Sequence, residues 1–136
     1  MWWALIDVTN QLFNDIYTAV IAAYPNANIL KTYQANSADF PCVTLREIGN
    51  TEIDRDLRNS GVRSQQSWQI DIYARGGTRE IIAKKIRDII ASVTEGKYHM
   101  KREASLPTDN AIDTTIYRWT LRYSCKVDEG HNIIYQ

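Results

Sequence analysis

The sequence lacks an apolar run long enough to form a membrane-spanning helix, so we expect no association with a membrane. It also lacks an excess of either charge, because 16 basic and 16 acidic residues cancel in a chain of 136 residues. No overall field attracts the chain to nucleic acid, and any basic patch must be local. The first residues, MWWALIDVTN, carry no cationic leader, so we expect the chain to stay in the cytoplasm.

Cysteine and histidine are scarce, with two residues of each type. Cys42 and Cys125 lie in apolar strand patterns and are expected as core residues, and the sequence leaves a disulfide between them open. Neither cysteine has the close spacing to His99 or His131 that a zinc site needs, so we predict no metal and no cofactor. Both histidines are expected to be exposed. No nucleophile lies beside a recognisable base, so we predict no catalytic residues and no enzyme.

Hydrophobic periodicity predicts two helices and several strands. Apolar residues recur every three or four positions from about residue 4 to Ala23, and again between Thr78 and Gly96. The glycine pair at 76–77 lacks the spacing of a phosphate-binding loop, so we interpret it as a turn with Thr78 as the N-cap. Strands are predicted over residues 29–33, 40–48, 68–74, 98–104 and 115–127.

This order of elements predicts an α+β fold, a two-layer sandwich with two helices on one face of a mostly antiparallel sheet of four or five strands. Residues 1–136 are expected to form one domain. Residues 49–67 are polar and contain glycine, which predicts a long loop or hairpin tip, and residues 106–111 predict a shorter loop. The tail at residues 128–136 is expected to dock on its own chain or on a neighbour's. Its apolar residues are Ile133, Ile134 and Tyr135.

The predicted strand at 115–127 has an aromatic, apolar side and a cationic side. The cationic side consists of Arg118, Arg122 and Lys126. Three interpretations remain open for it. It is a solvated face paired with Asp71 or Glu47 on neighbouring strands, a nucleic-acid surface, or a wall of a subunit interface.

The predicted loop at 49–67 interleaves acidic and basic residues, so mutual neutralisation is favoured over acid–base chemistry. A mobile loop that becomes ordered on a partner is one role for such a segment, and a solvated loop is the alternative. Its candidates for partner contacts are Arg55, Arg58 and Arg63.

The C-terminal third resembles tail-terminator proteins of long-tailed bacteriophages, a family also described as tail-completion, head–tail joining or minor capsid proteins. The shared pattern is a proline and an asparagine before a D-x-T-I-Y-R strand that continues to x-R-Y. The matching residues are Pro107, Asn110, Asp113, Thr115, Ile116, Tyr117, Arg118, Arg122 and Tyr123. Upstream, Phe40-Pro41 opens a strand, WQIDIYA follows a polar loop, and a lysine-rich helix comes next. The resemblance spans roughly residues 40–127.

The resemblance implies a structural protein without catalytic activity, assembled in the bacterial host cytoplasm and located in the tail or neck of the virion. Its copies would form a ring, usually of six, at the head-proximal end of the tail tube. The ring would stop tube polymerisation, contact the tail tube protein and the head connector, and let DNA pass through its lumen. Two alternatives remain: a head-completion or connector protein of the neck, and a small nucleic-acid-binding module.

Overall fold

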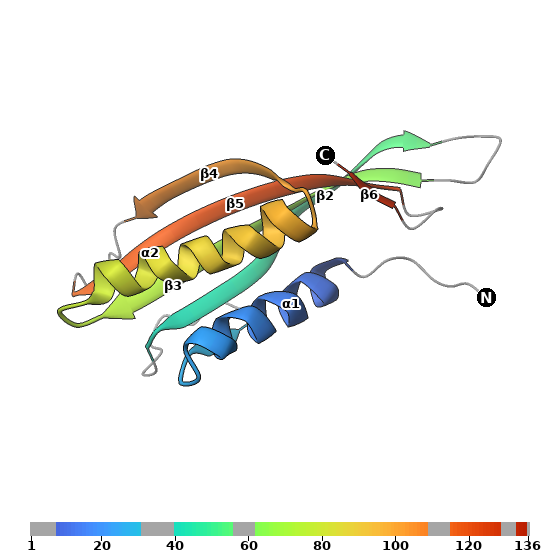
Figure 1. The fold of residues 1–136 in the computed structure, drawn as a ribbon. Helices are drawn as coiled ribbons and strands as arrows, with labels where there is room; N and C mark the ends of the chain where they lie inside the picture. The colour runs from blue at the N-terminus through green and yellow to red at the C-terminus, as the bar shows by residue number, and fades with distance from the viewer. Residues whose placement is uncertain (1–7, 31–39, 56–61, 109–114, 129–132, 136) are drawn as a thin grey trace.

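A computed structural model describes residues 8–30, 40–55, 62–108, 115–128 and 133–135, and the side chains of residues 9–30, 40–49, 65–108 and 115–126. The elements follow in the order helix, three strands, helix, three strands (Figure 1). The two helices are α1 (Val8–Ala23) and α2 (Arg79–Ala91), and a π-helical turn, η1 (Ser92–Lys97), follows α2. The strands are β1 (Asn28–Leu30), β2 (Cys42–Arg55), β3 (Val62–Arg75), β4 (Lys101–Thr108), β5 (Ile116–Asp128) and β6 (Ile133–Tyr135).

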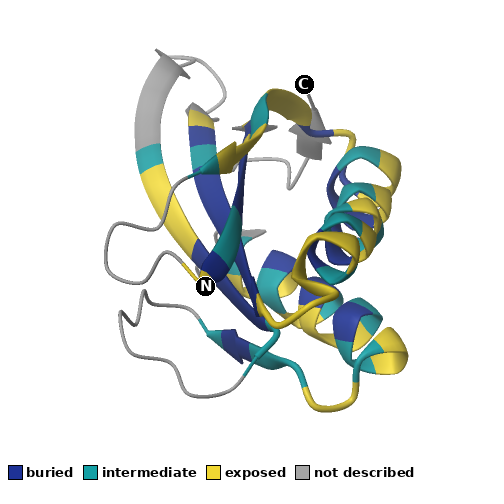
Figure 2. Cartoon of the chain, turned by 90° about the vertical axis from the view of Figure 1, so that its left-hand side faces the viewer, coloured by how far each residue is buried: buried dark blue, intermediate teal, exposed yellow. Residues whose placement is uncertain are grey.

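The six strands form one mixed sheet in the order β1-β2-β3-β5-β4. The short strand β6 pairs with residues 126–128 of β5, beyond the N-terminal end of β4. Only β1 runs parallel to its neighbour, and the other pairs are antiparallel. Both helices cover the same face, so sheet and helices form two layers (Figure 2). The predicted α+β sandwich is therefore confirmed, with β6 as an additional strand.

The predicted division of β5 into two faces is confirmed. Trp119, Leu121, Tyr123 and Cys125 are buried in the main core. The helices contribute the apolar stripes that cover them, and the buried members of these stripes are Leu12, Ile16, Val20, Ala83, Ile86 and Ile90. Burying one such aliphatic side chain stabilises the fold by about 1.5–3 kcal/mol.

Of the two alternatives for residues 49–67, the long loop is wrong, because β2 continues to Arg55 and β3 already begins at Val62. The hairpin agrees with the structure, since β2 and β3 pair antiparallel as expected. Backbone pairing runs through this polar stretch, for example between Thr51 and Gln65, with register shifts at Glu47/Gly49 and Glu52/Asp54. The paired ends of β2 and β3, called the hairpin arm below, extend past both helices (Figure 1). Neither α1 nor α2 covers the arm, so its strands need no apolar face toward them, and hydrophobic alternation could not reveal them.

Three smaller features also bear on the predictions. Strand β4 continues through Pro107 to Thr108, where a loop was expected, and proline is tolerated there because β4 is an edge strand. Thr78 occupies the N-cap position of α2 as predicted, but its side chain makes no capping hydrogen bond. The apolar part of the C-terminal tail forms β6, which pairs through its backbone with the end of β5 on its own chain.

We predict that Trp119→Ala lowers the free energy of unfolding by about 3–5 kcal/mol, the usual cost of truncating a large buried aromatic side chain. Trp119 is only 9% exposed and its indole Nε1 donates a hydrogen bond to Ser105 Oγ at 2.9 Å. Urea denaturation measures the loss. The control is Ile81→Ala, whose side chain on α2 is 57% exposed and should change stability by less than about 0.5 kcal/mol. Equal stabilities for the two variants would contradict the face assignment.

Candidate interaction surface on the open face of the sheet

The face of the sheet that the helices leave open carries a row of polar side chains across its three central strands. The antiparallel register places Arg46 of β2, Gln69 of β3 and Arg122 of β5 side by side. The next row contains Thr44, Asp71 and Thr120. Side chains at alternate positions of neighbouring strands share a face, so these two rows form one continuous polar surface.

Asp71 is the centre of this surface. Its side chain is only 4% exposed, and Arg118 Nε lies 3.1 Å from its Oδ1 in an ion pair. The same Oδ1 accepts a hydrogen bond from Thr120 Oγ1 at 2.7 Å, and Oδ2 accepts one from Gln69 Nε2 at 3.0 Å. A buried carboxylate is costly unless it is paired and hydrogen-bonded, and three donors satisfy that requirement here. The expected pairing between Asp71 and the cationic side of β5 is confirmed.

The hydrogen bonds continue outward from Asp71 in two directions. Arg122 Nε donates to Gln69 Oε1 at 3.1 Å, which joins an exposed guanidinium to the buried amide. On the other side, Thr108 Oγ1 donates to Thr120 Oγ1 at 2.8 Å and ties edge strand β4 into the network. The Arg118 guanidinium also lies 5.6 Å from the centre of the Tyr73 ring. The open face is therefore a connected polar layer that holds its arginines in defined positions.

The predicted site residues fall into three places. Arg118, Arg122 and Lys126 lie on the open face of β5, as their spacing predicted, with Arg118 partly buried and the other two exposed. Arg55 ends β2 and Arg63 lies in the paired part of β3, so both belong to the hairpin arm, whereas Arg58 lies outside the described residues. Ile133–Tyr135 form β6. The structure keeps the three β5 residues on one face, and strand pairing places Tyr135 of β6 opposite Lys126 and Arg63 of β3 opposite Asp128.

Sequence reasoning missed Arg46 and Gln69, and the alternative acidic partner that it offered for the cationic side of β5, Glu47, is wrong. Glu47 pairs in register with Trp68, so it belongs to the helix-covered side of β2, where it accepts a hydrogen bond from the Thr9 hydroxyl at 3.2 Å. Arg46 lies on the opposite side, in register with Gln69. The alternation of side chains along the strand already placed Arg46 on the same side as Cys42 and Thr44. Deciding which face of the sheet that side forms required the strand pairing.

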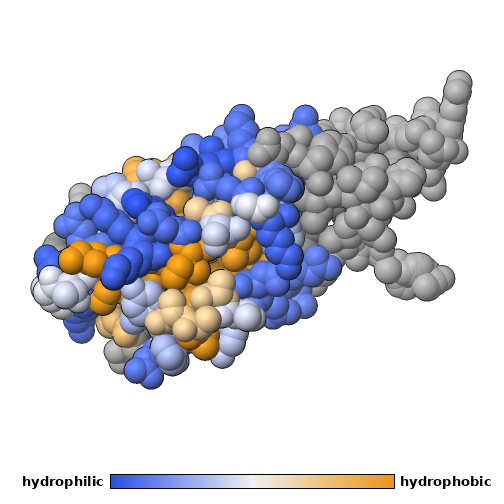
Figure 3. All heavy atoms as spheres, in the orientation of Figure 1, coloured by the Kyte–Doolittle hydropathy of each residue, from blue (hydrophilic) through white to orange (hydrophobic). Residues whose placement is uncertain are grey.

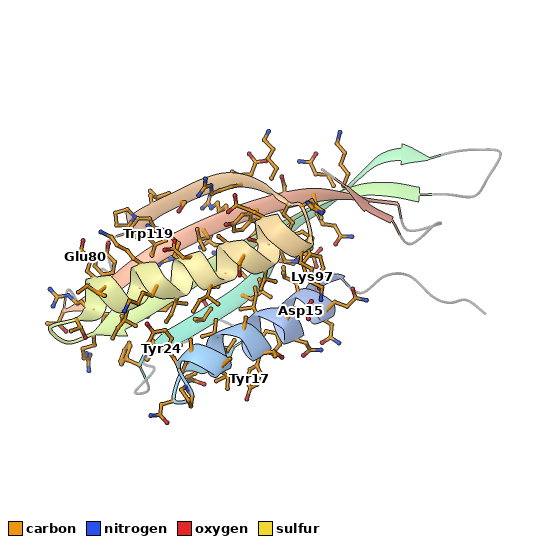
Figure 4. All side chains as sticks on the ribbon, viewed as in Figure 1. Asp15, Tyr17, Tyr24, Glu80, Lys97 and Trp119 are labelled. Carbon is orange, nitrogen blue, oxygen red and sulfur yellow. The ribbon has the colours of Figure 1, made fainter. Side chains whose placement is uncertain are left out.

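A second polar cluster joins α1 to η1. Asp15 accepts hydrogen bonds from Lys97 Nζ at 2.9 Å and from the Tyr98 hydroxyl (Figure 4 shows Asp15 and Lys97 pointing toward each other). These donors, Tyr98 first and Lys97 second, hold the pKa of Asp15 below its usual value, and burial raises the pKa of Tyr98. A cavity of about 430 Å³ lies beside the cluster, and His99 in its lining is exposed and has a φ of 54°.

The described residues offer little for covalent chemistry. Both cysteines are free and buried, and they cannot pair with each other because Cys42 lies on the open face and Cys125 in the helix-covered core. Burial raises the pKa of Cys125 to about 12, so its thiol stays protonated near neutral pH. Among the described residues, no three His, Cys, Asp or Glu side chains gather as ligands for a metal, and no helix is long and apolar enough to cross a bilayer.

We predict that Asp71→Ala destabilises the protein by about 2–4 kcal/mol, because it leaves the largely buried Arg118 without its carboxylate. Asp71→Asn keeps an acceptor for Thr120 and should fall between the wild type and the alanine variant. The matched control is Asp88→Ala, which removes a carboxylate that is 71% exposed and should leave the unfolding free energy unchanged. Urea denaturation of the three variants tests this, and an Asp71→Ala variant as stable as the control would contradict it.

We also predict a loss of stability at acid pH that depends on Asp15. The folded-state pKa of Asp15 lies below the ordinary value of 3.8, so this group stabilises the fold above that value and loses its contribution as the pH falls through the folded pKa. Unfolding free energies measured between about pH 6 and about pH 3 should fall more steeply for the wild type than for Asp15→Asn. Tyr98→Phe, which removes the first donor, should reduce the difference. Identical pH profiles for wild type and Asp15→Asn would contradict the assignment.

Comparison with known proteins identified no relative of this chain. No protein family matches the sequence, and no curated protein matches it. A functional proposal for this chain therefore depends on its own residues: the order of its sequence patterns, the polar layer on the open face, and the hairpin arm.

Proposed function

We propose that this protein is a structural subunit of a long-tailed bacteriophage, which forms a ring, of six copies, at the head-proximal end of the tail tube. The ring ends tube polymerisation and joins the tail to the head connector, without catalysis. The observation that carries the proposal is the order of sequence patterns over residues 40–127. Phe40-Pro41 leads into β2, WQIDIYA lies in β3, and the D-x-T-I-Y-R pattern leads into β5.

The two edges of the sheet support assembly into a ring. Strand β1 pairs with β2 only at residues 42–44, and the rest of the outer edge of β2 has no partner among the described strands. At the other side of the sheet, β4 likewise pairs only with β5 among the described strands. An open edge can accept a strand or a main-chain contact from another molecule. Two different edges on opposite sides suit the head-to-tail contacts from which rings are built.

The hairpin arm supports a second kind of contact, with a partner along the tube axis. The arm extends past α1 and α2 (Figure 1), so its strands reach beyond the body that the helices and the sheet form. Its sequence is rich in charged residues, including the candidate residues Arg55 and Arg63. Polar arms of this kind suit contacts with a partner that is already assembled, such as the end of a tail tube.

The helical face offers a third surface. Tyr17 on α1 is 47% exposed and Ile81 on α2 is 57% exposed. Figure 3 shows apolar residues over the helices with hydrophilic residues around them. Scattered exposed apolar side chains are normal on a monomer, so we assign the main subunit contact to the sheet edges and the open face, and not to this surface.

We predict that the purified protein forms an assembly with six times the mass of the 15.7 kDa chain, alone or when mixed with tail tube protein. Size-exclusion chromatography with light scattering measures the mass, and low-resolution imaging checks for a central hole. Phage lacking the gene should produce tails of uncontrolled length that do not join heads. A chain that stays monomeric at every concentration, with and without tube protein, would contradict the proposal, as would normal particles without the gene. A ring of twelve would favour the head-completion alternative.

A further inference from the structure

The cavity where α1 meets η1 is a second candidate site, separate from the open face of the sheet. Its volume of about 430 Å³ lies in the lower part of the range of roughly 300–1,000 Å³ that is usual for small-ligand pockets. All of its lining residues have side chains that the structure describes. They are Gln11, Asn14, Asp15, Lys97, Tyr98 and His99. The cavity therefore has room for a small molecule or for one end of a larger one.

Helix α1 supplies one wall of this cavity. Gln11, Asn14 and Asp15 are three and four residues apart, which places them on one face of the helix. Gln11 and Asn14 are exposed, and neither side-chain amide makes a hydrogen bond to another described residue. Two carboxamides on this wall are thus available to a ligand.

The π-helical turn after α2 supplies the opposite wall. The Tyr98 amide donates to the carbonyl oxygen of Val93, five residues earlier, at 3.2 Å. His99 follows with a φ of 54°, a left-handed conformation that is uncommon in residues other than glycine. π-Helical turns and strained backbone conformations of this kind are both frequent at functional sites. Here the two irregularities are adjacent in the chain and border the same cavity.

The two formal charges of the lining cancel, which argues against an ion as the ligand. Lys97 Nζ lies 2.9 Å from Asp15 Oδ2, and Figure 4 shows these side chains pointing toward each other. Tyr98 and Lys97 hold the pKa of Asp15 below its usual value, so the carboxylate is ionised near neutral pH. An anion would be repelled by this carboxylate and a cation by the Lys97 ammonium. The cavity instead suits a neutral molecule.

The remaining hydrogen-bonding groups of the lining suit hydroxyl groups. Gln11 and Asn14 each offer an NH2 group and a carbonyl oxygen, and a neutral imidazole at His99 adds one donor and one acceptor. Both internal hydrogen bonds to Asp15 end on Oδ2, so Oδ1 remains as an acceptor. A hydroxyl group donates one hydrogen bond and accepts two, so it can satisfy either kind of group. A ring that carries several hydroxyls can contact several of these side chains at once.

A peptide is the competing neutral ligand, and the lining lacks the groups that protein partners commonly use. Energetically important protein contacts centre on tryptophan, tyrosine and arginine side chains packed into the partner. Tyr98 is the only such residue in the lining, but it is 7% exposed and its hydroxyl is bound to Asp15. The exposed lining residues are all polar: Gln11, Asn14, Lys97 and His99. These observations favour a sugar over a peptide.

We propose that this cavity binds a small neutral saccharide, whose hydroxyl groups contact Gln11 and Asn14 on one side and Lys97 and His99 on the other. Asp15 holds Lys97 in position through Oδ2 and accepts a ligand hydroxyl at Oδ1. The inference does not rest on the proposed ring function, because the lining residues lie on α1 and around η1 and not on the open face, the hairpin arm or the sheet edges.

Saturation-transfer difference NMR with the full chain tests the proposal, because it detects weak ligands on a monomer and on a ring alike. The probes are glucose and N-acetylglucosamine as neutral sugars, methyl phosphate as an anion, and tetra-alanine as a peptide. We expect saturable binding of at least one sugar and no binding of the other two probes. Two sugars without binding overturn the proposal, and so does methyl phosphate or tetra-alanine that competes with a sugar for the cavity.

The variant Gln11→Ala/Asn14→Ala locates the bound sugar. It should raise the dissociation constant at least tenfold, because it removes both carboxamides from the wall that α1 supplies. Both positions are exposed and alanine favours a helix, so the variant should remain folded. The matched control is Asn26→Ala/Gln65→Ala, which removes the same two kinds of amide at exposed positions outside the cavity. Its dissociation constant should equal that of the wild type, and thermal melting checks that both variants fold.

His99→Gly is a second variant, which removes the imidazole and keeps the left-handed backbone, since glycine adopts a positive φ without strain. It should weaken sugar binding without lowering Tm. Sugar binding that is unchanged in both this variant and Gln11→Ala/Asn14→Ala overturns the proposal, because the ligand then lies elsewhere. Loss of binding in these variants and not in the control supports it. A chain that binds sugar in this way but never forms a ring overturns the ring function alone.

Discussion

The pairing of β3 with β5 decides which side chains meet on each face of this protein. The two strands pair without a break from Arg63 with Asp128 to Arg75 with Ile116. Because side chains alternate along each strand, this one register places Trp68, Ile70 and Ile72 beside the apolar side of β5 and under the helices. The same register places Asp71 opposite Thr120 on the other face. A slip by one residue would bury the arginines and expose the core, so the whole two-layer fold depends on it.

The open face shows how a sheet can be polar and still be largely buried. Thr44, Gln69, Asp71, Thr120 and Ser124 are all nearly inaccessible, yet they lie on the face without helices. Hydrogen bonds from Gln69 and Thr120 to Asp71, and from Ser124 to Glu103, offset the cost of removing these polar groups from water. Such networks contribute less to stability than an apolar core of equal size, but they hold side chains in defined directions. Here that property positions Arg122 at the surface.

The hairpin arm illustrates a limit of reading structure from hydrophobic patterns. Apolar alternation identifies a strand only where one face is covered, and the arm lies beyond both helices. Backbone hydrogen bonds with β3 extend β2 to Arg55 regardless of its polar composition. The core part of the same strands was predicted correctly because Val43, Leu45, Ile70 and Ile72 face the helices. The proposed function assigns partner contacts to the arm, the open face and the sheet edges. None of these parts requires an alternation of apolar side chains in the sequence.

The sequence alone determined the two helices, the main strands and the cationic side of β5. Each of these follows from the periodic spacing of apolar and polar residues within one segment, which can be recognised without knowing how the segments pack. It also offered Asp71 and Glu47 as alternative partners for that side, of which Asp71 is the one that pairs with Arg118. Only the tertiary structure decided that Arg46 lies in one row with Gln69 and Arg122, that Glu47 faces the other way, and that β6 pairs with β5. These relations depend on which strands pair and in which register. Strand pairing joins residues that are far apart in the chain, so the pattern within a single segment cannot predict it.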